Sequence, residues 1–216
     1  MAKIQDIRNK VAPSKTIRKI AQITKIARHH SATTSGDYFA FWKNRWKGLG
    51  WTKGGYAEII LPDGTVQLCY DPIYPTNGIG NHNTNTYHIC VVGNGAFTAA
   101  QERAFEERCL LAIKNFGLSV DDVLGHNEFS GTATSCPGIN MDSVRKRLKE
   151  LNQPKKEVAG VSEQKLNAYQ EKVRQEAMKL GITDGKNPFR EVNQYYVWNA
   201  LLPLARELEE LKKKVK

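Results

Sequence analysis

Hydrophobic and polar positions change their period several times along the chain, and this change predicts both strands and helices. Residues 23–28, Ile-Thr-Lys-Ile-Ala-Arg, alternate as a core strand does and end directly before His29. Residues 87–93 form a continuous apolar run, which is typical of a buried central strand. Two further apolar segments meet at Asp63-Gly64, and this dipeptide between strands predicts a β-hairpin.

Three segments have the period of amphipathic helices. A capping box formed by Thr98 and Gln101 marks the start of the second, and Gly48 and Gly50 end the first. We expect one face of each helix, the aromatic face of the first included, to lie in the core. These faces carry Phe39, Trp42, Trp46 and Leu49 in the first helix, Phe105, Cys109, Ala112 and Phe116 in the second, and Met141, Val144, Leu148 and Leu151 in the third.

Strands and helices therefore alternate, which predicts an α/β fold: a central mixed β-sheet flanked by helices, with a small C-terminal helical module. Residues 1–152 form the expected main domain, and the composition of 153–161 is that of a linker. The module at 162–216 should contain two helical stretches, at 162–180 and 189–214. A local sequence pattern marks each of these predicted elements. The basic residues 3–22 lack such a pattern, and we expect them to contain some helix.

The composition of the chain limits which kinds of partner and which cellular location we expect. The net charge of +10 favours an anionic partner, such as nucleic acid, a membrane surface or a cell-wall polymer. No nucleic-acid recognition signature is found, so nucleic acid is not expected as a partner. No apolar run reaches about 18 residues, so membrane insertion is not expected either. The N-terminal residues lack the apolar core of a secretory signal, so we expect synthesis in the cytoplasm.

Two motifs hold candidate metal ligands. Histidines stand side by side at His29 and His30, and the loop GHNEFSGTATSCPG, residues 125–138, carries His126 and Cys136. His29, His126 and Cys136 together supply two imidazoles and a thiolate, three ligands that leave the fourth tetrahedral position of Zn²⁺ open for water. Each of the three alone is more typical of a loop histidine or a buried thiol. As a set they predict a catalytic zinc site.

Four motifs occur in a fixed order: HHSAT, GWTKGGYAEIILPDGTV, GNHNTNTYHICVVG and GHNEFSGTATSCPG. Over residues 23–150 the chain resembles the zinc-dependent N-acetylmuramoyl-L-alanine amidases, a family that includes bacteriophage endolysins and animal peptidoglycan-recognition proteins. The resemblance implies a Zn²⁺ cofactor on His29, His126 and Cys136, with His30 on the other face of its strand. It also implies a groove over the metal for bacterial peptidoglycan, and hydrolysis of the amide between N-acetylmuramic acid and L-alanine.

The resemblance also implies roles for residues near the metal. Tyr56, in the GY motif, would hydrogen-bond the attacking water or the developing oxyanion. Thr134, two residues before the cysteine, would be a second oxyanion partner. Two positions depart from the family pattern: Ala57 and Gly78 stand where the family usually has histidines, the second of which binds substrate. His82, four residues after Gly78, could compensate.

Polar loop residues complete the candidate site, and the substrate-binding candidates are Asn81, His82, Asn85 and Glu128. Asparagine amides suit sugar and peptide recognition, but turns use Asn as readily. Glu128 could orient a ligand histidine or be a solvated loop charge. We expect His88 to be a packed strand residue and Trp51 to lie in the core or the groove. The remaining cysteines, Cys69, Cys90 and Cys109, should behave as small hydrophobic residues.

The biological role predicted is that of a phage or prophage endolysin, made without a signal peptide and acting on the cell wall after release; a bacterial autolysin fits as well. The alternative is a module that binds peptidoglycan without cutting it, but such relatives typically lack the cysteine ligand. Residues 153–216 have 13 Lys and Arg against 9 Asp and Glu, which favours anionic wall polymers. Self-association into a homo-oligomer, or simple packing on the main domain, would explain the module equally well.

Overall fold

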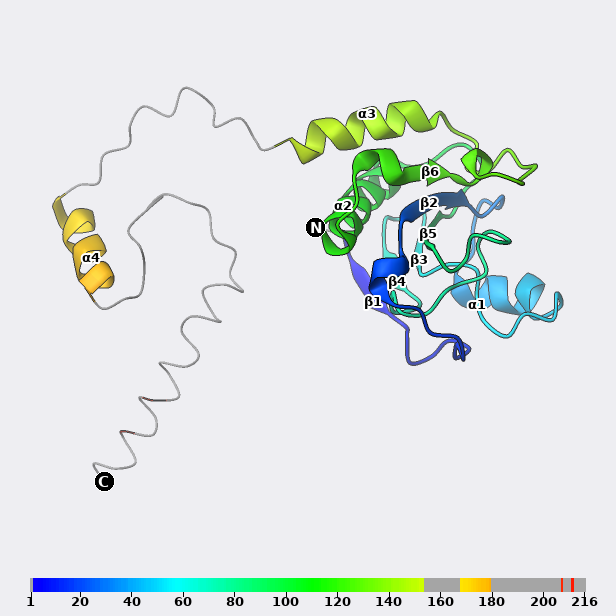
Figure 1. Cartoon of the computed structure of the whole chain (residues 1–216), viewed down its shortest axis with the longest axis horizontal. Helices are drawn as coiled ribbons and strands as arrows, with labels where there is room; N and C mark the ends of the chain where they lie inside the picture. The colour runs from blue at the N-terminus through cyan, green and yellow to red at the C-terminus, as the bar shows by residue number, and fades with distance from the viewer. Residues whose placement is uncertain (1, 154–167, 180–206, 208–210, 212–216) are drawn as a thin grey trace. The chain divides into compact units, whose positions relative to one another are not determined.

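The computed structural model describes residues 2–153, 168–179, 207 and 211 (Figure 1). Contacts divide the chain into two units, 1–155 and 156–216, which we describe separately. In the second unit, α4 spans Ala168–Lys179, inside the first helical stretch expected there. The expected linker and nearly all of the second stretch lie outside the described residues. No helix in the described part of the chain is long and apolar enough to span a membrane.

Six strands form one mixed sheet in the order β1-β4-β3-β5-β2-β6. The strands are β1 (Ile4–Asp6), β2 (Lys25–His30), β3 (Glu58–Ile60), β4 (Val66–Leu68), β5 (Thr86–Val91) and β6 (Val123–Gly125). Every neighbouring pair is parallel except β3 and β4, which form the predicted hairpin with Gly64 at a φ of 84° in its turn. The sheet confirms the expected fold class, and the fully buried β5 is the expected central strand.

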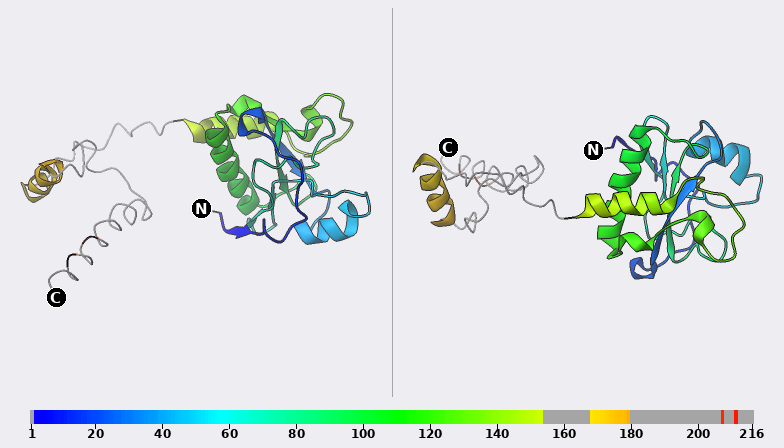
Figure 2. Two further views of the ribbon diagram at one scale, coloured as in Figure 1. Left: turned by 60° about the horizontal axis from the view of Figure 1, so that its bottom comes forward. Right: turned by 90° about the horizontal axis from the view of Figure 1, so that it is seen from above.

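Helices cover both faces of this sheet. Figures 1 and 2 show α2 (Ala99–Phe116) and α3 (Met141–Asn152) on one side and α1 (Tyr38–Phe41) on the other. The predicted capping box opens α2: the Gln101 amide donates to Thr98 Oγ1 over 3.1 Å, and the Thr98 amide donates to the Gln101 side chain over 2.9 Å. The strands alternate between two apolar layers: Ile60, Ile89 and Val91 pack toward α2, whereas Ile59, Cys90 and Val92 pack toward Tyr38 and Trp46.

The first predicted helix differs from expectation. Phe39 and Leu49 are 43% and 53% exposed, while Tyr38 is buried beside Trp46. The α-helical turn continues as a π-helical turn, Trp42–Trp46, in which a backbone N–H donates to the carbonyl five residues back. This wider turn shifts the buried face away from the 3.6-residue period that the stripe was assumed to follow.

The N-terminal segment forms β1 and then crosses to the start of β5, and the helix expected within it is a single 3₁₀ turn at Ile20–Gln22. There the buried Arg18 guanidinium donates to four backbone carbonyls, at distances of 2.7 to 3.1 Å: Pro72, Asn83, Thr84 and Thr86. Burial lowers the pKa of Arg18 to about 10. Since a buried cation needs such partners, Arg18 fixes the long loop that leads into β5.

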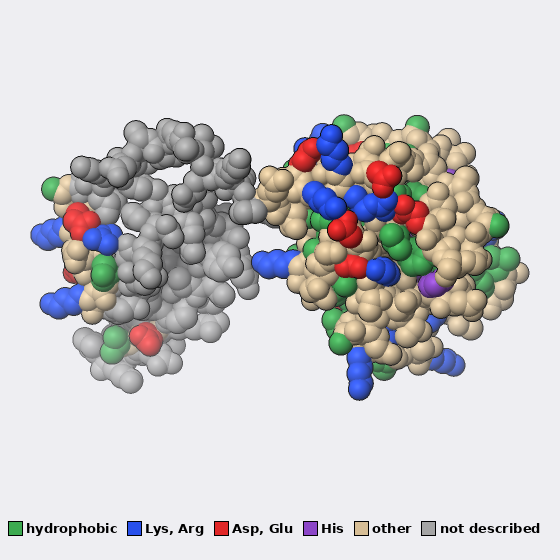
Figure 3. All heavy atoms as spheres, turned by 45° about the horizontal axis from the view of Figure 1, so that its top comes forward, with side chains coloured by type: hydrophobic (Ala, Val, Ile, Leu, Met, Phe, Trp, Pro, Cys, Tyr) green, Lys and Arg blue, Asp and Glu red, His purple; other side chains and the backbone are tan. Residues whose placement is uncertain are grey.

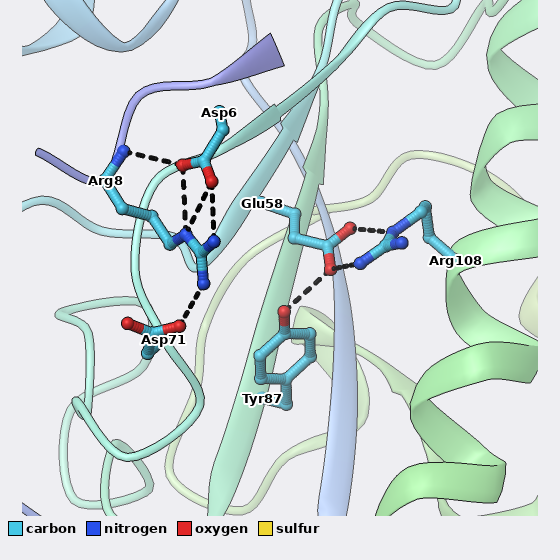
Figure 4. A network of polar contacts seen from close by, with 6 residues as sticks. All are labelled: Asp6, Arg8, Glu58, Asp71, Tyr87 and Arg108. Carbon is cyan, nitrogen blue, oxygen red and sulfur yellow. Dashed lines mark hydrogen bonds and ion pairs between the residues drawn. The ribbon is translucent and has the colours of Figure 1, made fainter. Parts of the chain in front are cut away.

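A buried ion pair joins α2 to the middle of the sheet (Figure 4). Glu58 on β3 accepts hydrogen bonds from Nε and Nη2 of Arg108, at 2.7 and 2.6 Å, and from the Tyr87 hydroxyl at 2.7 Å. In the same view Arg8 bridges Asp6 and Asp71 at the edge of the sheet. The Glu58 carboxylate, which is 1% exposed, therefore has its three hydrogen bonds to side chains of α2 and β5.

We expect Arg108→Ala to lower the free energy of unfolding by about 3–5 kcal/mol, because it leaves the buried Glu58 carboxylate without its cationic partner. Urea denaturation at pH 7 measures this. Arg103→Ala, at an exposed position of the same helix, is the matched control and should change the value by less than about 0.5 kcal/mol. A loss below about 1 kcal/mol for Arg108→Ala would contradict this account of the pair.

Candidate metal centre

Three predicted ligands from separate segments converge at one edge of the sheet. His29 lies near the end of β2, His126 directly follows β6, and Cys136 lies in the loop before α3. One ligand atom from each residue falls within 4.8 Å of the other two. Because β2 and β6 are parallel neighbours, their carboxyl ends meet at this edge, which explains why the two histidines approach each other.

The alternation of β2 decides which of its side chains reach the centre. Arg28 points to the α2 side, where its guanidinium bonds the Glu102 carboxylate at 2.6 and 2.9 Å and lies 4.3 Å from the Phe105 ring centroid. His29, the next residue, therefore points to the opposite face, where it is buried. The strand thus carries a structural cation and a candidate ligand on successive residues.

Backbone hydrogen bonds close the loop that carries the other two ligands. The Asn127 amide donates to the Cys136 carbonyl over 2.8 Å. The His30 amide donates to Cys136 Sγ over 3.3 Å, and His30 Nδ1 lies 3.1 Å from the Pro137 carbonyl oxygen. His30 therefore holds the loop against β2, and it is not among the three residues whose ligand atoms converge.

Burial sets the protonation of the candidate ligands. It lowers the pKa of His29 well below the ordinary value and also lowers that of His126, so both imidazoles are neutral near pH 7. Burial raises the pKa of the Cys136 thiol to about 11, against the opposing effect of the His30 amide. The neutral rings offer lone pairs to a cation, and the thiol must release its proton to bind one.

The donor set fits zinc. Two imidazoles and one thiolate are typical zinc ligands, and tetrahedral zinc places such ligand atoms roughly 3.3–3.7 Å apart. His29 Nδ1 lies 3.8 Å from Cys136 Sγ, close to that spacing without rearrangement. With three protein ligands the set has the composition of a catalytic rather than a closed structural site.

Two predicted catalytic residues lie beside these ligands. The Tyr56 ring centroid is 5.0 Å from that of His29, and Trp46 packs edge-on against the same phenol at 5.6 Å. Burial, with Cys90 and Cys136 nearby, raises the pKa of Tyr56 well above its usual value, so the phenol stays protonated and can donate. Thr134 is exposed, and its Oγ1 accepts from the Cys136 amide over 3.2 Å; the hydroxyl hydrogen can still be donated elsewhere.

Sequence reasoning missed the contact between His88 and the metal centre. His88 is a buried strand residue, as expected, but its Nδ1 lies 3.0 Å from His29 Nε2. A signal was present in β5: His88 and Cys90 alternate with Tyr87 and Ile89, so the two residues share the face that bears His29. The pattern could not show that β5 and β2 would be neighbours.

The substrate-binding candidates lie at unequal distances from the ligands. His82 Nε2 is 3.1 Å from the Ser130 carbonyl oxygen, and the ring packs on Phe129, so His82 joins its loop to the ligand loop. Asn81 is exposed in the same loop, with a φ of 65°. Asn85 lies at the amino end of β5, five residues before Cys90 and thus roughly 16 Å along the strand, where its carbonyl pairs with β2.

Glu128 supports the backbone before His126. Its carboxylate accepts from the Gly125 amide and from two nitrogens of Arg145 on α3, each at 2.8 Å. These bonds lower the pKa of Glu128, with Arg145 the largest cause. Two alternatives were left open for Glu128: that it orients a ligand histidine, or that it is a solvated loop charge. The contacts match neither fully, because the carboxylate holds the backbone before His126 and does not touch the His126 ring. Its role toward substrate stays a prediction, as do those of Asn81, His82 and Asn85.

The surface near α3 does not form a basic patch. Ion pairs there join Arg145 to Glu128 and Asp142, Arg147 to Glu106, and Lys149 to Asp121. Figure 3 shows blue and red side chains adjoining on this face of the first unit. The positive net charge of the chain is therefore not concentrated here.

Comparison with known proteins finds a family model that matches the segment containing the candidate ligands. The family model described as N-acetylmuramoyl-L-alanine amidase matches residues 19–139, which include all three candidate ligands. No curated protein matched the chain.

Solved structures share the fold at low sequence identity. The N-acetylmuramoyl-L-alanine amidase LysC from Clostridium intestinale URNW aligns with a TM-score of 0.59 and 18% identity over 69% of this chain and 99% of that one. The Ph2119 endolysin from the Thermus scotoductus MAT2119 bacteriophage gives 0.57 and 20% over 68% and 98%. Bumblebee PGRP-SA gives 0.55 and 21% over 69% and 95%. At these identities the similarity shows the fold.

We expect Cys136→Ser to weaken zinc binding at least 10-fold, because a serine hydroxyl is a far poorer zinc ligand than a thiolate. Competition with a chromophoric chelator, followed by metal analysis, measures the affinity. Cys109→Ala removes another buried thiol, on α2, and should leave zinc affinity unchanged. Equal affinity in Cys136→Ser and the wild type would remove Cys136 from the metal centre.

Proposed function

Because the chain belongs to the N-acetylmuramoyl-L-alanine amidase family, we propose that it is a zinc-dependent hydrolase that cleaves the amide between N-acetylmuramic acid and L-alanine in bacterial peptidoglycan. The observation that carries this proposal is the convergence of His29, His126 and Cys136, whose ligand atoms lie within 4.8 Å. The matched segment contains all three, and their chemistry suits a catalytic zinc ion.

Each residue at the centre has a role in this reaction. When bound, zinc supplies a Lewis acid for the scissile carbonyl and makes hydroxide available near neutral pH. His29 holds its ligand position from a rigid strand, while His126 and Cys136 hold theirs from the closed loop. The neutral phenol of Tyr56 donates a hydrogen bond to the oxygen on which negative charge develops, and the exposed hydroxyl of Thr134 is the second donor.

The substrate would lie along the loops beside the metal ligands. His82 links the loop of residues 77–85 to the ligand loop, so a glycan-peptide lying there contacts both. Exposed Asn81 and Thr134 offer hydrogen bonds to such a ligand. Asn85 would contact only a substrate that extends well beyond the metal.

The biological role that we propose is host lysis by a phage or prophage endolysin, which would act on the wall after its release from the cytoplasm. Similarity in fold to a bacteriophage endolysin supports this role. The positive balance of residues 153–216 supports contact of the C-terminal module with anionic wall polymers. A homo-oligomer held by that module is a further expectation.

A second candidate function is peptidoglycan binding without cleavage. The chain shares its fold with peptidoglycan recognition proteins, among them an ectodomain complex of two such proteins bound to tracheal cytotoxin. The complete ligand set and the neighbouring phenol favour hydrolysis over this alternative.

We expect the zinc-loaded protein to release, from purified peptidoglycan, stem peptides that are free of N-acetylmuramic acid and have a new N-terminal L-alanine. A chelator should abolish this release. Mass spectrometry of the soluble products identifies the bond cleaved. Restoration by added zinc is the control for damage by the chelator. Tight binding to the wall with no new L-alanine terminus, in protein that contains zinc, would favour the binding module instead.

We expect Tyr56→Phe to retain zinc but to reduce kcat by about 10²-fold or more, the usual cost of losing one oxyanion donor. Initial rates on purified wall, together with zinc content, test this. Tyr74→Phe, on a phenol packed in the same apolar layer, is the control and should leave the rate unchanged. Full activity in Tyr56→Phe would remove the role proposed for that hydroxyl.

A further inference from the structure

His88 forms a buried polar contact that the reaction proposed above does not use. Its Nδ1 is 3.0 Å from Nε2 of His29, and both rings are almost completely shielded from solvent. The other ring nitrogen, Nε2 of His88, has no hydrogen-bond partner in the described part of the chain. A histidine that leaves a buried nitrogen unsatisfied contributes poorly to stability, which indicates that its contact with His29 serves another purpose.

The direction of this hydrogen bond follows from the geometry of His29. Its Nδ1 faces Cys136 Sγ at 3.8 Å, so Nδ1 is the atom available to a metal ion. A neutral imidazole that binds metal through Nδ1 carries its proton on Nε2. The His29 Nε2–H group must therefore donate, and His88 Nδ1 must accept. The reverse direction would place the proton of His29 on the nitrogen that the metal needs.

Gly78 maintains the position of the His88 ring. A Cβ atom at residue 78 would lie 2.5 Å from Cγ and from Nδ1 of His88, far inside contact distance. The glycine therefore lets the loop pass directly over the ring. Since its φ is not in the left-handed region, this contact rather than backbone conformation restricts position 78.

We propose that His88 is a positioning residue for the metal centre: it accepts a hydrogen bond from His29 Nε2–H, and Gly78 keeps its ring in place to do so. The contact fixes both the tautomer and the ring orientation of His29, the effect that partners behind a ligand histidine have on a metal site. The inference rests on the zinc site of the proposed function but not on the reaction, so metal binding tests it whether or not the protein cleaves peptidoglycan.

The test compares zinc affinity in full-length His88→Leu and His88→Asn, measured by chelator competition. Leucine fills space without an acceptor, so we expect 10–100-fold weaker binding. Asparagine can place its amide oxygen where Nδ1 stands, so we expect affinity within about 3-fold of the wild type. Ile89→Val, on the opposite face of β5, controls for loss of packing and should not change affinity. Wild-type affinity in folded His88→Leu, or equal losses in Leu and Asn, would overturn the proposal.

Two further measurements decide the matter if His88→Leu does not fold. In ¹⁵N-histidine spectra of the zinc-loaded wild type, His88 should carry its proton on Nε2 and His29 its proton on Nε2; a proton on His88 Nδ1 would overturn the proposal. Gly78→Ala should displace the ring and weaken zinc binding, whereas Gly80→Ala, whose Cβ meets nothing within 4 Å, should not. Unchanged affinity in Gly78→Ala would also count against it.

Discussion

The parallel pairing of β2 with β5 is the constraint on which the candidate metal centre depends. Their register places His29 opposite Cys90 and diagonally next to His88, on the face away from α2. A slip of one residue would turn Arg28 into the centre and His29 into the apolar layer under α2. Arg28 favours the observed register, because its buried guanidinium pairs with Glu102 on α2 and would lose this partner on the other face.

The two faces of the sheet bury different kinds of polar group. Under α2 the strands bury ion pairs, Arg28 with Glu102 and Glu58 with Arg108, which fix the helix to the sheet. On the other face the buried groups are neutral rings and thiols, which can receive a cation without first losing a charged partner. Arg18 is the exception, and it is satisfied by backbone carbonyls of the loop it holds.

Local signals predicted the features that are decided locally. The hairpin turn at Asp63-Gly64 and the capping box at Thr98 involve residues a few positions apart, and both were found as expected. The sequence motifs singled out His29, His126 and Cys136 as candidate ligands, and these residues come together only through strand order. What sequence reasoning missed depends on contacts across the sheet: the π-helical turn of Trp42–Trp46, the carbonyl partners of Arg18 and the contact of His88. No periodicity encodes which strands will be neighbours.

The candidate centre combines one rigid, buried residue with two on a loop, and under the proposed function this division determines the side from which a substrate would approach. His29 is 1% exposed, and His88 lies behind its ring, so a substrate would not reach a bound metal from the sheet. His126 is half-buried and Thr134 is exposed, which leaves the side of the ligand loop as the open one. The Asn127 amide bond to the Cys136 carbonyl, the contacts of His30 and the packing of Phe129 against His82 hold that loop, so the open side keeps its geometry for an approaching substrate under the proposed function.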